Sequence, residues 1–251
     1  MNEYLIVFLF FIIALFYSSI GFGGGSSYLA LLSILLTDFF EIRSLALMLN
    51  LVVVSIGTIM YIRNRIFDWK QFWPFLVFSI PAAFLGSQFK FSESTFFLVL
   101  SSALLLSAMM LIVQTFSNYQ SSKKLTLPKR SLAGFGIGLL SGVTGIGGGV
   151  FLSPVLNLFR WANPKTIASL ASVFILVNSV AGLTGLAVGG SFKMDGNFAW
   201  KIILAVGTGG LIGSYLSNSS INVNVIRGLT ALLVGYVGLR ILLLNGWGIQ
   251  I

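Results

Sequence analysis

The chain has 251 residues, of which 57% are hydrophobic and only 8% are charged. This composition excludes a water-soluble domain and indicates several membrane-spanning helices, since continuous apolar runs do not fit a barrel. The absence of cysteine and histidine excludes disulfides, thiol nucleophiles and the common zinc sites. Most of the net charge of +9 lies in connectors, where it orients the chain in the membrane. We expect no metal, no cofactor and no nucleic-acid partner.

The first half of the chain begins with an apolar segment at residues 4–19, which lacks the basic start of a signal peptide. The glycine-rich stretch GFGGG at 21–25 interrupts it, and a short apolar piece, SSYLALLSILLT, follows. Three apolar stretches come next, at residues 42–62, 71–89 and 95–114. Each approaches the ~20 residues that a helix needs to cross a bilayer.

The second half is separated from the first by a polar linker, SNYQSSKKLTLPKR, which carries four positive charges. We therefore predict a first transmembrane domain at 1–116, a basic cytoplasmic linker at 117–131 and a second transmembrane domain at 132–251. The second half contains GIGGG at 145–149 and the short piece VFLSPVLNLF. Long apolar stretches follow at 166–187, 198–216 and 223–244.

Four landmarks recur in the same order in the two halves. GFGGG matches GIGGG, and SLALMLNLVVVSIG at 44–57 matches SLASVFILVNSVAG at 169–182. Asp68 matches Asp195, and FLGSQF matches LIGSYL. This recurrence predicts an internal duplication.

The duplicated pattern predicts an all-α polytopic membrane protein with about eight long helices, two of them broken by glycine. If the short pieces cross separately there are ten segments and the repeats are inverted; otherwise there are eight crossings and parallel repeats. The positive-inside rule does not choose between these topologies, but both place RNRIFDWK and KKLTLPKR in the cytoplasm. We favour inverted repeats, because half-helix N-termini from opposite sides can then meet at the midplane.

The glycine breaks are the candidate functional feature. A helix that restarts inside the membrane leaves free N–H groups and about half a positive charge at its N-terminus, so an anion is the natural partner. Glycine also lets a ligand approach the backbone closely. The candidate substrate-binding residues are therefore Gly23, Gly24, Gly25, Ser26, Ser27, Thr144, Gly147, Gly148 and Gly149.

Other small and polar residues within the apolar segments are expected either to pack helices together or to join the candidate site. Gly134, Gly138, Gly142, Gly209 and Gly213 have the four-residue spacing of helix-packing notches. Three polar residues join the candidate site: Asn50, Ser172 and Asn178. Each asparagine either lines a cavity or ties two helices together, because an unpaired amide in the membrane is costly.

The acidic residues fall at segment ends or in connectors, and none lies deep in a span. A proton- or sodium-coupled symporter often keeps a carboxylate in the membrane, so this placement favours facilitated anion movement. Asp68 and Asp195 are interpreted as solvated connector acids, with a cap or gate as the alternative. We do not expect an intramembrane enzyme, because the sequence has no histidine, no cysteine, no G-x-S-x-G motif and no carboxylate pair within a span.

The chain resembles the TauE/SafE family, also called the sulfite exporter or toluene sulfonate uptake permease family, over essentially its whole length and most closely in its second half. The resemblance rests on LLSGVTGIGGGVFLSPVL and ASLASVFILVNSVAG, followed by the connector with Asp195. Pro154 after the glycines fits the family, whereas the first half lacks this proline, and Ala171-Ser172 replaces a frequent Thr-Ser pair. The resemblance implies a secondary transporter or facilitator of sulfur-containing anions such as sulfite, sulfoacetate or other sulfonates, in the inner (cytoplasmic) membrane. An anion channel that uses the same helix N-termini is the alternative.

Overall fold

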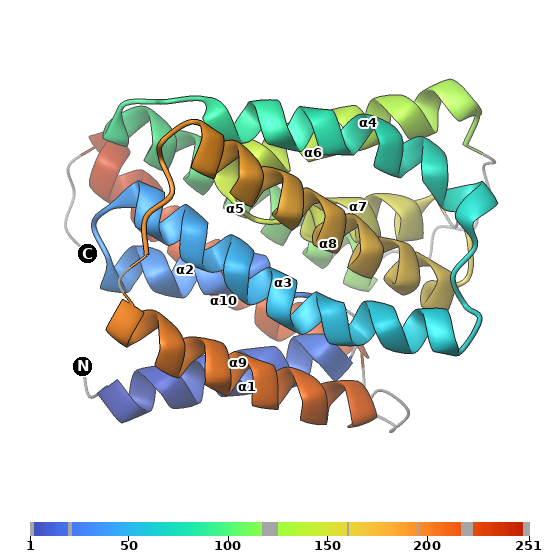
Figure 1. Ribbon diagram of the computed structural model, residues 1–251, viewed down its shortest axis with the longest axis horizontal. Helices are drawn as coiled ribbons and strands as arrows, with labels where there is room; N and C mark the ends of the chain where they lie inside the picture. Colours follow the sequence, from blue (N-terminus) through green and yellow to red (C-terminus); the bar gives the residue numbers. More distant parts are fainter. Residues whose placement is uncertain are drawn as a thin grey trace.

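A computed structural model describes residues 3–19, 22–116, 125–159, 161–194, 196–216 and 223–247. These residues form ten α-helices and no strand (Figure 1). The helices are α1 (Glu3–Ser19), α2 (Gly25–Leu35), α3 (Phe39–Arg63), α4 (Trp69–Gln88), α5 (Glu93–Phe116), α6 (Leu127–Thr144), α7 (Gly149–Leu158), α8 (Pro164–Val188), α9 (Gly196–Leu216) and α10 (Val223–Trp247). Asp195 lies outside the described residues. Helix α6 begins inside the predicted linker, so residues 127–131 are helical.

Four helical stretches of the described chain are long and apolar enough to cross a membrane: Phe39–Arg63, Glu93–Val113, Lys165–Val188 and Ala199–Leu216. The outer surface is also apolar, with large side chains exposed on several helices, including Phe8, Met109, Leu204 and Leu232. Polar side chains such as Asn50 and Asn178 are fully buried instead. An apolar exterior around buried polar groups suits a lipid environment, and the chain is a multi-pass helical membrane protein.

Glycine notches bring two pairs of helices into backbone contact. A Cβ at Gly134, Gly138 or Gly142 of α6 would meet the backbone of Phe75, Ser79 or Ala83 of α4. Gly209 and Gly213 of α9 lie in the same way against the backbone of Phe11 and Leu15 of α1. The predicted packing role of these five glycines is confirmed. The residue pairs also show that α4 runs parallel to α6 and α1 parallel to α9.

Helices α3 and α8 pack against each other in opposite directions. Thr58, late in α3, bonds Ser172, early in α8, through their hydroxyls at 3.0 Å. Ser44, early in α3, accepts a hydrogen bond from the backbone N–H of Lys193, which follows α8. Figure 1 shows the same arrangement, with α3 and α8 side by side at the centre of the bundle.

Three of the long helices, α3, α4 and α8, begin with side-chain caps. Asp38 accepts from the backbone N–H groups of Phe40 and Glu41 at the start of α3. Asp68 accepts from the N–H of Lys70 at the start of α4, and Asn163 accepts from the N–H of Thr166 at the start of α8. Asp68 is therefore an N-cap rather than a free connector acid.

Candidate functional site

The two glycine-rich stretches each separate a long helix from a short one. Helix α1 ends at Ser19 before α2 begins at Gly25, and α6 ends at Thr144 before α7 begins at Gly149. With 11 and 10 residues, α2 and α7 are each only about 15 Å long, half the thickness of a bilayer core. The breaks use left-handed backbone, which only glycine adopts at little cost. Within the two breaks, the glycines with positive φ are Gly24, Gly145, Gly147 and Gly148, at 81–84°.

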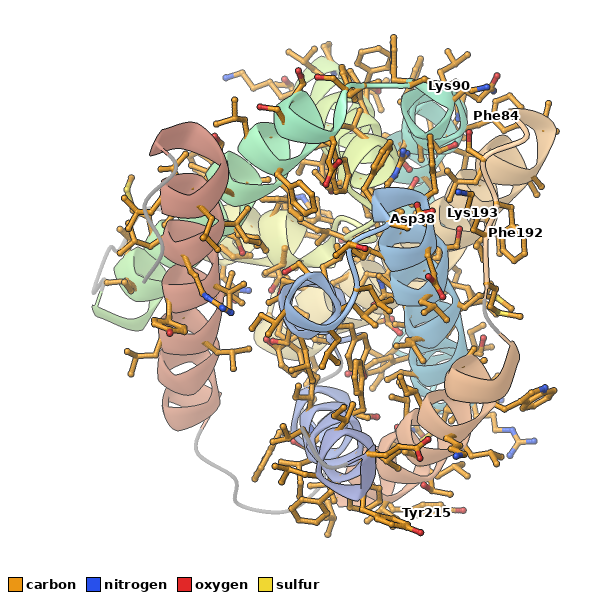
Figure 2. All side chains as sticks on the ribbon, turned by 90° about the vertical axis from the view of Figure 1, so that its left-hand side faces the viewer. Asp38, Phe84, Lys90, Phe192, Lys193 and Tyr215 are labelled. Atoms are coloured by element: carbon orange, nitrogen blue, oxygen red, sulfur yellow. The ribbon has the colours of Figure 1, made fainter. Side chains whose placement is uncertain are left out.

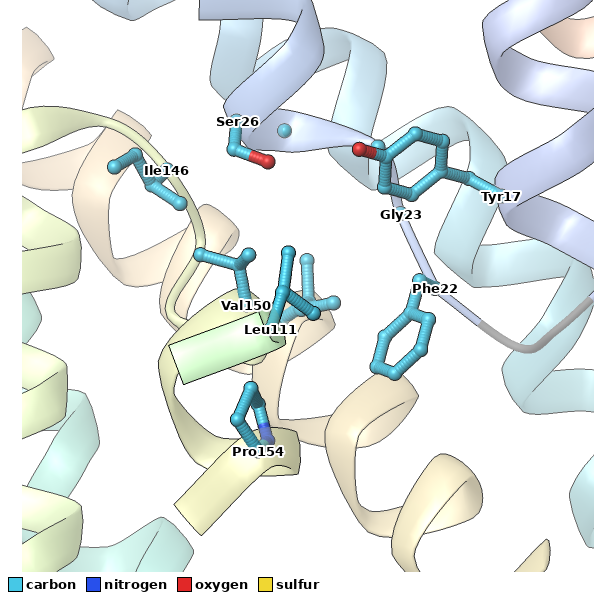
Figure 3. A pocket seen from close by; sticks show the side chains of 11 residues that line it. Tyr17, Phe22, Gly23, Ser26, Leu111, Ile146, Val150 and Pro154 are labelled. Carbon is cyan, nitrogen blue, oxygen red and sulfur yellow. The ribbon is translucent and has the colours of Figure 1, made fainter. Parts of the chain in front are cut away.

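The two glycine stretches meet in the interior of the protein. A Cβ on Gly25 would overlap the carbonyl oxygen of Ile146, so the first stretch touches the second through backbone atoms. A cavity of ≈ 30 Å³ lies between them (Figure 3). Its lining consists of Tyr17, Phe22, Gly23, Gly24, Gly25, Ser26, Leu111, Ile146, Val150, Pro154 and Ile175. Residues from both halves of the chain thus form a single small cavity.

Asn50 of α3 holds the two glycine stretches together. Its Nδ2 donates to the carbonyl oxygen of Ile146 at 3.0 Å. A Cβ on Gly23 would lie 2.8 Å from Asn50 Oδ1, and one on Gly147 would lie 2.9 Å from Nδ2. Asn50 was expected either to line a cavity or to hold two segments together. Its hydrogen bond to Ile146 favours the second role, at a position directly behind the cavity wall.

The N-termini of α2 and α7 differ from those of α3, α4 and α8. Each begins after a glycine N-cap, Gly24 or Gly148, and neither has a side-chain cap hydrogen bond. Ser26 in the first turn of α2 points into the cavity (Figure 3), and its buried Oγ has no hydrogen-bond partner. Two buried helix N-termini that lack the caps found on α3, α4 and α8 leave N–H groups available to a ligand.

The remaining predicted site residues lie around the cavity but do not line it. Ser27 Oγ bonds the Tyr17 hydroxyl at 2.6 Å. Thr144 Oγ1 donates to the carbonyl of Leu140 in its own helix at 2.7 Å. Gly147, Gly148 and Gly149 shape the second break; a Cβ on Gly148 would lie 2.7 Å from the ring of Phe174.

Ser172 and Asn178 belong to α8. Ser172 joins α8 to α3 through the Thr58 hydroxyl. Asn178 is fully buried, and neither its Oδ1 nor its Nδ2 has a hydrogen-bond partner. Its amide therefore keeps its full hydrogen-bonding capacity in the interior.

The sequence analysis did not identify several residues that line the cavity, nor one buried charged residue. Phe22, Leu111, Ile175 and Tyr17 are apolar or aromatic, and nothing distinguishes them from the other apolar residues of their segments. Arg43 is different, because it is fully buried in α3. It lies within the apolar stretch 42–62, and a charge inside a predicted span is itself a signal.

A multi-pass helical membrane protein with an interior cavity between two broken helices has the architecture of a membrane transport protein. The chain belongs to the family described as "Sulfite exporter TauE/SafE", which it matches over residues 6–241. It is 32% identical over 239 residues to the "Probable membrane transporter protein y4hK" of Sinorhizobium fredii (strain NBRC 101917 / NGR234), covering 93% of this chain and 95% of that protein. No solved structure matches the chain significantly. Both descriptions are those of transport proteins, not enzymes.

Proposed function

We propose that this protein carries small sulfur-containing anions, such as sulfite, sulfoacetate or other sulfonates, across the inner (cytoplasmic) membrane. The observation that carries the proposal is the meeting of two uncapped helix N-termini, α2 and α7, at one interior cavity. Each N-terminus supplies about half a positive charge and several N–H donors. The family description supports the substrate class, and the family description and the relative's name both support the transport role.

The substrate in this proposal binds to backbone rather than to side-chain groups. The first N–H groups of α2 and α7, with the Ser26 hydroxyl, donate to the anion's oxygens, while Leu111, Val150 and Pro154 cover its organic part. A mostly apolar site with a few oriented donors is typical of small-molecule pockets. Gly147, Gly148 and Gly149 allow the close approach, and Asn50, Ser172 and Asn178 border the site.

The present cavity is too small for such an anion. A volume of ≈ 30 Å³ holds roughly two water molecules, and even sulfite is bulkier. Binding therefore requires α2 and α7 to separate. A site that must widen to admit its substrate is expected of a carrier rather than of a permanently open channel.

The two halves in this proposal form inverted repeats. The opposite directions of α3 and α8, which occupy equivalent positions in the two halves, support this. The parallel packing of α4 and α6 supports a shared, cytoplasmic side for the connector before α4 and the linker before α6. The chain has no native cysteine. Maleimide labelling of Arg65→Cys from outside intact cells would contradict this orientation.

The driving force in this proposal is the membrane potential. The carboxylates of the described residues lie near helix ends, and none is fully buried. An interior-negative potential pushes each negative charge outward by roughly 2.3 kcal/mol per 100 mV. Export therefore needs no coupled ion.

The proposal is tested first by binding. Purified protein is heated with sulfite, sulfate, thiosulfate, sulfoacetate, taurine or simple carboxylates. An anion at about ten times its Kd stabilises the fold by roughly 1.4 kcal/mol. Calorimetry with the best anion should then give one site per chain, since both breaks border one cavity.

Transport is tested in proteoliposomes with the radiolabelled form of that anion, with protein-free liposomes as the control. We expect saturable uptake and counterflow. Uptake without saturation or counterflow would indicate a channel. The substrate assignment is wrong if none of the sulfur anions binds or moves.

A further inference from the structure

Arg43 is the one charged side chain that is fully buried among the described residues. Its Nη2 donates to two backbone carbonyls, of Ser87 at 2.9 Å and of Gly142 at 2.8 Å. These carbonyls belong to the last turns of α4 and α6, where intrahelical donors are missing and the helix dipole is negative. The Phe96 ring lies below the guanidinium, with its centroid 5.8 Å from Cζ. Arg43 therefore joins the ends of two helices.

These hydrogen bonds use only one of the three guanidinium nitrogens, Nη2. Nε and Nη1 are buried and have no hydrogen-bond partner. Among the described residues, Arg43 forms no ion pair with a carboxylate. A buried charge with unused donors is costly, and a side chain with no exposed surface does not reach the lipid interface. The free donors therefore point to an anionic ligand.

Arg43 lies between the cavity and one end of the molecule. Its Cα is 3.2 Å from where a Cβ on Gly145 would lie, and the next residue, Ile146, lines the cavity. Along α3, Arg43 is about 7 Å from Asp38 and about 10 Å from Asn50, which touches the cavity wall. Asp38 and Lys193 lie together at that end of the molecule (Figure 2). An anion that moves between the cavity and this end passes the level of Arg43.

We infer that Arg43 is a further anion-binding residue on the transport path, and that it acts together with the backbone site at the glycines on the one anion bound per chain. Its Nε and Nη1 donate to the oxygens of a sulfite or sulfonate group that leaves or approaches the cavity on the Asp38 side. The guanidinium keeps its charge at every physiological pH and matches planar sets of oxyanion acceptors. It therefore favours anions over cations and neutral molecules. The inference rests on the proposed function and adds a residue outside the glycine segments.

The test compares Arg43→Gln with Lys193→Gln, which makes the same change in net charge at a cation already paired with Asp38. Calorimetry with sulfite and with sulfoacetate measures Kd for each purified variant. We expect Arg43→Gln to weaken binding by about 10- to 100-fold, the range for losing charge-assisted hydrogen bonds, and Lys193→Gln to stay within about twofold of wild type. A clamp between α4 and α6 alone would lower thermal stability and leave Kd of the folded variant unchanged.

If the Arg43→Gln variant does not fold, Arg43→Lys tests the same inference. An ammonium still donates to the carbonyls of Ser87 and Gly142 but lacks Nε and the second nitrogen, so binding should fall by about tenfold or more. Wild-type affinity in Arg43→Lys, or in folded Arg43→Gln, would overturn the role of Arg43 while the proposed function stands. Wild-type protein that binds neither sulfite nor sulfoacetate would overturn both.

Discussion

Asn50 and Asn178 are the same residue type with the same complete burial, yet the structure predicts opposite effects when each is replaced by leucine. Asn50 donates to the carbonyl oxygen of Ile146 across the two halves. Asn178 has no partner for either amide atom. Leucine keeps the branching of asparagine at Cγ and removes the polar atoms, so each variant mainly reports the value of the amide.

The expected magnitudes follow from these partners. Asn50→Leu loses one interhelical hydrogen bond, and such bonds in membrane proteins contribute about 0.6 kcal/mol on average and at most about 1.7. Asn178→Leu removes a buried amide whose desolvation no hydrogen bond offsets, a gain of about 1 kcal/mol or more. The two variants should therefore differ by roughly 2 kcal/mol in the free energy of unfolding.

The assay is reversible unfolding in mixed detergent–SDS micelles, followed by circular dichroism. Thr184→Val is a suitable control, because its hydroxyl bonds only the Ala181 carbonyl in its own helix. Transport in proteoliposomes separates stability from function: if Asn178 borders the substrate, the stabilised Asn178→Leu variant transports poorly. Equal destabilisation by both leucine variants would refute the assignment of partners to the two amides.

Three further predictions concern the breaks and the Asp38 end. Gly25→Ala should destabilise the protein by about 1–3 kcal/mol through overpacking, whereas Gly136→Ala, with nothing within 4 Å of the new Cβ, should not; equal unfolding free energies would contradict this. Gly148→Leu should abolish transport while the protein still inserts, because its φ is 82° and the ring of Phe174 fills the space of a side chain; normal uptake by a well-expressed variant would count against it. Although partial burial raises the pKa of Asp38, hydrogen bonds from Lys193 and two backbone N–H groups hold it below the ordinary value. This stabilisation is present above about pH 4 and lost as the pH falls through the lowered pKa, so the acid limb of a stability–pH curve should be weaker in Lys193→Gln.

Much of the fold could be predicted from local sequence. The apolar stretch at 4–19 corresponds to α1, and the stretches at 42–62 and 71–89 fall within one to three residues of α3 and α4. This works because membrane helices depend on the hydropathy and length of each segment, both local properties. Four-residue glycine spacing likewise predicted the close packing of α6, since small residues at that spacing always leave a groove.

The tertiary structure alone decided which groups meet. Asn50 and Ile146 are 96 positions apart, and Thr58 and Ser172 are 114 apart. A helix that is apolar all round carries no periodic signal of which face packs against which neighbour. The partners of Asn50 and Asn178 therefore could not be predicted from their nearly matched positions in the two halves. Arg43 was visible as a charge within an apolar stretch. Only the assembled bundle brings the last turns of α4 and α6 to its Nη2 and leaves its Nε and Nη1 without partners.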